Sequence, residues 1–198
     1  MAGDRLGRGH IAFFIYLDLD GNAAFDPVRV TNEDVPAIGS DWDGAITPPR
    51  DLMTPFDLPR LVDAMLRRLG AAGCTLSIAT NKRLLPTRLI LDHLGWSSHF
   101  AAVYALDLFE PRLPDKAAMI ARLMQDHGIA HADAVYVGDR GEDGESADAN
   151  HLPFIAATWG YGSLDAGEMA PHWRAAASPE ALADEILGDA RPQTVQGV

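Results

Sequence analysis

The sequence predicts an α/β protein with a doubly wound (Rossmann-like) parallel sheet, helices on both faces and a small β-type insert after the first strand. Short apolar runs alternate with segments of helical period, and polar residues follow several of the apolar runs. This alternation favours right-handed strand–helix–strand units and a parallel sheet. The length fits one domain over residues 1–198, with the insert at 22–57 and a disordered tail at 189–198.

The first strand is predicted over residues 11–17, an apolar run rich in aromatic and β-branched side chains. It ends in Asp18-Leu19-Asp20-Gly21, so it delivers two acids to an edge of the sheet. The following residues, 22–57, are rich in proline, glycine, aspartate and asparagine and hold only short β-like pieces. A long insert of this kind is usually functional, and we expect a small β-hairpin flap.

The remaining elements follow in order. Apolar residues at helical spacing predict a helix over 58–69, with Asp57 as its N-cap. Gly95 and Gly128 stand just beyond two further predicted helices, and Ser178-Pro179-Glu180 is a helix start. Asn150 stands where we expect a left-handed helix end. The predicted strands are 74–79, 100–106, 134–137 and 154–157, and the other predicted helices are 85–94, 117–126 and 178–187.

Composition and charge exclude several classes of function. A net charge of −12 argues against nucleic acid as the main partner, because phosphate backbones attract basic surfaces. The 47% hydrophobic content and a mean hydropathy of −0.04 suggest neither disorder nor a membrane span. The lone Cys74 rules out an internal disulfide. Arg5 and Arg8 before the first apolar run imitate a signal peptide, but no cleavage site follows, so we expect a cytoplasmic protein.

Polar side chains that follow predicted strands should meet at one edge of the sheet, where open α/β sheets bind their ligands. Paired carboxylates there need a counter-charge, most simply a metal ion. Carboxylate oxygens suit Mg²⁺, and a hydroxyl and a lysine beside them suit phosphoryl transfer. The residues of this predicted site are Asp18, Asp20, Thr80, Asn81, Lys116, Asp139 and Asp143.

Four segments in this order, YLDLDGN, LSIATNK, LPDKAAMI and VYVGDRGED, resemble the haloacid dehalogenase superfamily in its phosphatase branch. The later segments ATWGYGS and SPEALADEIL are similar to phosphoglycolate-phosphatase-like members. The resemblance implies a Mg²⁺-dependent phosphomonoesterase that acts on a small phosphorylated metabolite. The expected state is a monomer or homodimer without a nucleic-acid or membrane partner.

The resemblance also implies roles for individual residues. Asp18 would be the nucleophile that forms an aspartyl-phosphate, and Asp20 the general acid/base. Thr80 would hydrogen-bond the phosphoryl group, and Lys116 would neutralise negative charge. Mg²⁺ would be held by Asp18, the backbone carbonyl of Asp20, Asp139 and Asp143. The residues expected to contact substrate are Gly21, Asn81 and Trp42, with Phe25 an alternative to Trp42 near the leaving group.

Several alternatives stay open. Asp41-Trp42-Asp43-Gly44 is a second possible nucleophile motif, although proline and glycine interrupt the segment before it. Neither motif has its glycine where a calcium-binding EF-hand loop requires it. Asn22 stands where the family has threonine, a departure that would suit a catalytically lapsed binding or regulatory protein. A phosphoryl transferase or mutase of the same superfamily would use the same residues.

Overall fold

The computed structural model describes residues 10–13, 58–159, 164 and 167–189. Within these residues one six-stranded sheet has the order β3-β2-β1-β4-β5-β6, and every neighbouring pair is parallel. This confirms the predicted doubly wound fold. The strands are β1 (His10–Phe13), β2 (Thr75–Thr80), β3 (Phe100–Ala105), β4 (Ala134–Gly138), β5 (Phe154–Ala157) and β6 (Arg174–Ala176).

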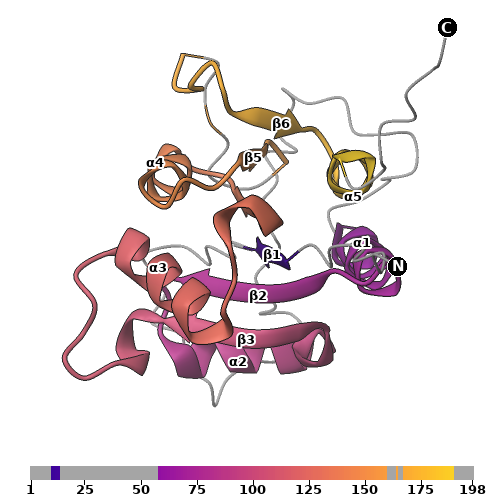
Figure 1. Cartoon of the computed structure of the whole chain (residues 1–198). Coiled ribbons are helices and arrows are strands. Elements are labelled where there is room, and N and C mark those ends of the chain that lie inside the picture. The colour runs from indigo at the N-terminus through magenta and orange to yellow at the C-terminus, as the bar shows by residue number, and fades with distance from the viewer. Residues whose placement is uncertain (1–9, 14–57, 160–163, 165–166, 190–198) are drawn as a thin grey trace, which may run out of the picture.

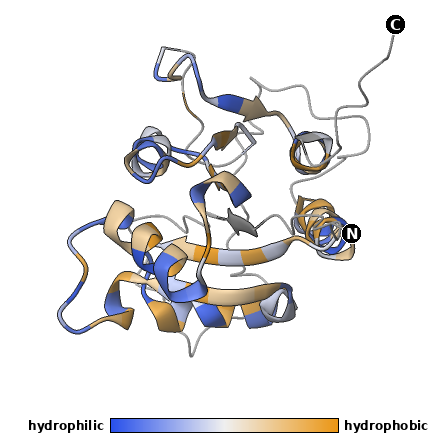
Figure 2. Cartoon of the chain, viewed as in Figure 1, coloured by the Kyte–Doolittle hydropathy of each residue, from blue (hydrophilic) through white to orange (hydrophobic). Residues whose placement is uncertain are grey.

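Helices cover both faces of the sheet. In Figure 1, α3 and α4 lie on one side of the stacked strands and α1 and α5 on the other. Figure 2 shows that β2 and β3 are mostly hydrophobic, whereas α2 and α3 carry hydrophobic and hydrophilic residues together. The helices are α1 (Leu58–Ala71), α2 (Leu84–His93), α3 (Lys116–His127), α4 (Gly141–Ala149) and α5 (Pro179–Asp189), with short 3-10 turns η2 (Ser97–His99), η3 (Leu106–Leu108) and η4 (His131–Asp133).

The strand β1 lies at the centre of the sheet. Phe13 pairs in register with Ile78 of β2 and with Val137 of β4. On one side of β1 the strands continue to β2 and β3, and on the other to β4, β5 and β6, so the strand order reverses between β1 and β4. Ligands of open α/β sheets bind at this kind of switch point, beyond the carboxyl ends of the strands.

The helix α1 forms because its apolar residues recur every three or four positions. Leu58, Val62 and Met65 are buried in one cluster with Leu66 and Leu69. The same cluster holds α5 residues such as Leu182, and a second cluster on α3 and α4 includes Met119 and Leu123. Full burial of a Leu or Met side chain stabilises the fold by about 1.5–3 kcal/mol. The two clusters fix the helices that carry the polar residues described below.

The helix α3 has strong signals at both ends. The Asp115 carboxylate accepts a hydrogen bond from the Ala118 N–H at 2.8 Å, which places Lys116 at the first helical position. At the other end Gly128 adopts a left-handed conformation with φ of 62°, which a residue with a Cβ rarely adopts. These local signals explain why the predicted helix, 117–126, agrees with the observed one within one residue at each end.

Some predicted details differ from the structure. The short edge strand β6 was not predicted, because three residues between a turn and the start of α5 carry little pattern. The left-handed residue after α4 is His151, with φ of 56°, and not Asn150. The Asn150 side chain instead donates to the carbonyls of Ala117 and Ser146, which ties α4 to α3. The helix α5 reaches Asp189, the first residue of the predicted tail.

The insert predicted at 22–57, with its flap, and the tail residues 190–198 lie outside the described residues. No helix of the described part is both long and apolar enough to cross a membrane.

A packing contact between α4 and Trp173 gives a first testable prediction. A Cβ on Gly144 would lie 2.4 Å from the Trp173 ring, which also packs edge-on against Phe154. Gly144→Ala should therefore destabilise the protein by about 1–3 kcal/mol through overpacking. Gly70→Ala in α1 is the matched control, because nothing lies within 4 Å of its Cβ position. It should stabilise the fold by about 0.5–1 kcal/mol, and equal shifts for the two variants in urea unfolding would contradict the prediction.

Candidate functional site

Polar residues gather where β2 and β4 end. Thr80 is the last residue of β2, and Asp139 directly follows the last residue of β4. Each is only 4% exposed. Because β1 lies between these two strands, both residues flank the end of the central strand. The structure thus brings two of the predicted site residues to the carboxyl edge of the sheet, at the switch point.

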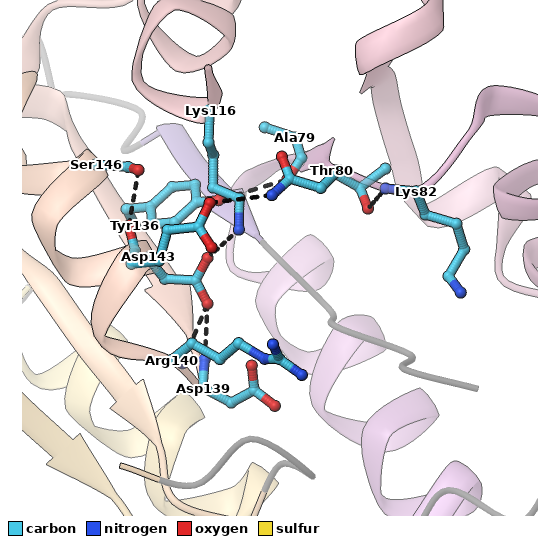
Figure 3. A network of polar contacts seen from close by, with 11 residues as sticks. Ala79, Thr80, Lys82, Lys116, Tyr136, Asp139, Arg140, Asp143 and Ser146 are labelled. Atoms are coloured by element: carbon cyan, nitrogen blue, oxygen red, sulfur yellow. Dashed lines mark hydrogen bonds and ion pairs between the residues drawn. The ribbon is translucent and has the colours of Figure 1, made fainter. Parts of the chain in front are cut away.

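Lys116 and Asp143 form a buried ion pair beside them (Figure 3). The Lys116 Nζ lies 2.5 Å from Asp143 Oδ1, and the two side chains are 1% and 0% exposed. Removing two charges from water costs several kcal/mol per ion, which close pairing and further hydrogen bonds must offset. This ion pair joins the first residue of α3 to the first turn of α4. Removing either partner would leave the other charge buried without compensation and would lower the stability of the fold.

The second oxygen of Asp143 holds the loop after β4. Asp143 Oδ2 accepts hydrogen bonds from the backbone N–H groups of Asp139 and Arg140, each at 3.2 Å. In Figure 3 Asp143 lies between Lys116 and these two residues. The Asp143 carboxylate thus orients the segment that carries Asp139.

Gly138 is required by the same arrangement. A Cβ on Gly138 would lie 2.4–2.5 Å from three atoms of the Asp143 side chain, closer than any real contact. The side chain of Asp143 therefore occupies the space that any other residue at position 138 would need. Gly138, which directly follows the predicted strand 134–137 and was interpreted as a loop residue, is here part of the geometry of the site.

The resemblance implies Asp143 as a Mg²⁺ ligand, and this stays a prediction. In the structure Oδ1 of Asp143 contacts Lys116, and Oδ2 accepts from two backbone N–H groups. A carboxylate oxygen has two lone pairs, so the contact of Oδ1 with Lys116 does not by itself prevent coordination of a cation. Among the described residues no group of three or more His, Cys, Asp and Glu could hold a metal.

The side-chain hydroxyl of Thr80 is oriented by a local hydrogen bond. Its Oγ1 accepts from the Lys82 backbone N–H at 3.0 Å, a tight local turn typical of threonine and serine. A hydroxyl has one donor hydrogen and two acceptor lone pairs, so this contact uses a lone pair. The hydrogen of the hydroxyl can therefore point to an oxygen bound at the sheet edge.

Tyr136 lies beneath the site and was not among the predicted site residues. It is fully buried in β4, and its hydroxyl donates to the Ala79 carbonyl of β2 at 3.4 Å. Burial raises the pKa of Tyr136 well above its ordinary value, and the carboxylates of Asp143, Glu142 and Asp139 raise it further. The phenol stays neutral and links the two strands that flank β1. In the sequence, the place of Tyr136 within the apolar segment 134–137 was the one feature that indicated a buried tyrosine near the site.

The remaining predicted site residues, Asp18, Asp20, Gly21 and Trp42, lie outside the described residues. The same holds for the rival pair Asp41 and Asp43.

Comparison with known proteins identifies the family. A model of the haloacid dehalogenase-like hydrolases matches residues 45–157, more than half of the chain. The chain belongs to this family. The matched range includes Thr80, Lys116, Asp139 and Asp143 and begins directly after the second Asp-x-Asp-Gly sequence, so it contains neither acid pair.

The curated relatives include a phosphoglycolate phosphatase from Xanthomonas campestris, 38% identical over 100 residues. That alignment covers 50% of this chain and 45% of the relative, so the chain spans about half the length of the curated relatives it matches. A crystal structure of a predicted phosphatase from Clostridium acetobutylicum is 31% identical, with a TM-score of 0.58 over 64% of this chain and 58% of that chain.

One structural match extends along nearly the whole chain. A haloacid dehalogenase-like hydrolase from Streptococcus pneumoniae has a TM-score of 0.58 over 93% of this chain and 99% of that chain. Its sequence identity of 18% makes this a likeness of fold. This likeness supports the same kind of α/β fold for the described part of the chain.

Proposed function

We propose that this protein is a Mg²⁺-dependent phosphomonoesterase that hydrolyses a small phosphorylated metabolite through an aspartyl-phosphate. The observation that carries the proposal is the buried Lys116–Asp143 pair beside Thr80 and Asp139, at the switch point of the sheet. Membership in a hydrolase family and relatives named phosphatases support the same reaction. Phosphoglycolate is the first substrate to test, because several of these relatives are named for it.

Each residue has a definite part in the proposed reaction. Asp18 attacks phosphorus and Asp20 protonates the leaving oxygen, then takes a proton from the water that cleaves the phosphoenzyme. The Thr80 hydroxyl donates to a phosphoryl oxygen. The ammonium group of Lys116 supplies positive charge beside the nucleophile and the phosphoryl group. Asp143 holds this ammonium group in place.

The oxygen donors at the edge fit a hard cation such as Mg²⁺. Asp139 and Asp143 would hold it with Asp18 and the backbone carbonyl of Asp20, and Asp143 would also orient Asp139 through its backbone N–H. Bound there, Mg²⁺ would neutralise charge on the phosphoryl oxygens.

Metal removal tests the proposal directly. We expect hydrolysis of p-nitrophenyl phosphate and of phosphoglycolate in the presence of Mg²⁺, loss of turnover after exhaustive chelation, and recovery when Mg²⁺ is returned. Zinc should restore less activity, because an oxygen-only site suits the harder ion. Turnover that survives chelation would refute the metal dependence. A lack of hydrolysis across a broad panel of phosphate esters would favour the catalytically lapsed alternative.

A second test separates the two acid pairs. Asp18→Asn should lower turnover by at least about 10³-fold, because an amide is a far poorer nucleophile than a carboxylate. Asp41→Asn should retain a substantial part of the activity and serves as the matched control. Mass spectrometry of acid-quenched enzyme should show the phosphoryl adduct on the peptide that contains Asp18. An adduct on the peptide that contains Asp41 would reverse the assignment.

A further inference from the structure

A hydrogen bond joins the two loops that flank the end of β1. The Asn81 Nδ2 donates to Glu142 Oε1 at 3.1 Å. Asn81 directly follows β2, and Glu142 lies in the first turn of α4, just beyond β4. Because β1 lies between β2 and β4 in the sheet, this contact crosses over the line of the central strand. We call it the Asn81–Glu142 bridge.

The bridge fixes the direction of the Asn81 side chain and the turn around it. A carboxylate only accepts hydrogen bonds, so the amide nitrogen of Asn81 must be the atom that faces Glu142. Asn81 is also the middle residue of the turn closed by the Lys82 N–H and the Thr80 hydroxyl. Glu142 therefore anchors the turn whose first residue is proposed to bind the phosphoryl group.

Electrostatics alone does not explain why an acidic residue stands at position 142. Asp139 and Asp143 already supply carboxylates within the same turn of chain, and a phosphate ester is itself an anion. An acidic residue anywhere in the first turn of α4 interacts favourably with the helix dipole, by about 0.3–1 kcal/mol, and Glu142 is itself exposed, so the dipole does not single out this position. Glu142 is instead paired across the site, at a hydrogen-bonding distance from another loop.

We propose that Glu142 is a positioning residue for phosphoryl binding, acting through Asn81. The proposal rests on the proposed function, since it concerns the same site. If so, Glu142 strengthens the binding of the phosphate group, although Glu142 itself carries a negative charge. A bystander carboxylate would have the opposite effect.

The sign of the change in phosphate affinity tests the proposal. Glu142→Ala should weaken the binding of inorganic phosphate, measured by calorimetry with Mg²⁺ present, by about tenfold, and should raise KM more than it lowers kcat. Glu142→Gln keeps an acceptor oxygen and loses the charge, so it should bind phosphate at least as tightly as the wild type. Tighter phosphate binding in Glu142→Ala would overturn the proposal.

Two further variants show whether Glu142 acts through Asn81. In an Asn81→Ala background, Glu142→Ala should change phosphate affinity by less than about twofold, because the bridge is already absent. Glu145→Ala removes an equal charge from an exposed position of the same helix and should leave the affinity unchanged. Additive effects of Asn81→Ala and Glu142→Ala would overturn the proposal, as would equal effects of Glu142→Ala and Glu145→Ala.

Failure of the bridge and failure of the proposed function give different results. If the wild type hydrolyses phosphate esters but the two substitutions are additive, the bridge is wrong and the function stands. If the wild type binds phosphate with the expected coupling but hydrolyses no ester, the function is wrong and the bridge stands. A wild type that neither binds phosphate nor hydrolyses an ester overturns both.

Discussion

Lys116→Met is expected to lose about 3–5 kcal/mol of unfolding free energy, together with the turnover of the proposed phosphatase reaction. Asp143 is 0% exposed, so the substitution leaves a carboxylate buried without its cation. For a chain of this size, each kcal/mol lowers the melting temperature by roughly 2–4 °C. Urea unfolding followed by far-UV circular dichroism, with hydrolysis of p-nitrophenyl phosphate, measures both effects.

A double variant separates the two effects of Lys116. In Lys116→Met with Asp143→Asn, both charges are absent, while the asparagine oxygen can still accept from the backbone N–H groups of Asp139 and Arg140. The double variant should regain most of the lost stability, because replacing a buried pair as a whole is often nearly neutral. It should stay inactive, because the ammonium group is gone. A double variant that is no more stable than Lys116→Met, or one that hydrolyses substrate, would contradict this account of the pair.

The parts of the fold that the sequence predicts are those with local causes. Helix α3 has an N-cap at Asp115 and a left-handed Gly128 at its end, and both signals act within one turn of the chain. The buried strands β2 and β4 are apolar runs that end in polar residues. For the same reason Thr80, Lys116 and Asp139 could be assigned to one edge of the sheet before any contact was known.

Contacts between distant segments could not be predicted in this way. The sequence places Asp143 one helical turn after Asp139, but not the fact that its two oxygens are shared between Lys116 and a backbone loop. The Asn81–Glu142 bridge joins residues 61 positions apart, and no local sequence pattern in either segment predicts it. The strand β6 was missed for a related reason, since a short edge strand is stabilised mainly by its pairing with β5.

Gly138→Ala is expected to lower kcat/KM by about 10²-fold or more, although it adds a single methyl group. The new Cβ would overlap the Asp143 side chain at 2.4 Å, so either Asp143 or the end of β4 must move. Movement of Asp143 disturbs its contact with Lys116, and movement of the strand end displaces Asp139. A displacement of about 1 Å in a catalytic group can cost 10²-fold in rate.

Gly141→Ala, at the first residue of α4 and three positions further along the chain, is the matched control for this prediction. Its Cβ would meet only the Leu164 side chain, at 3.4 Å, which is close to an ordinary contact. It should therefore keep activity within about threefold of the wild type, since a small shift of one flexible side chain relieves the contact. The two variants differ in whether the added methyl group displaces Asp143, so their activities measure how strictly the reaction depends on the position of that carboxylate. Wild-type kcat/KM in Gly138→Ala would show that the reaction tolerates a shift of Asp143, and Asp143 would then lose its proposed role in positioning Lys116 and Asp139.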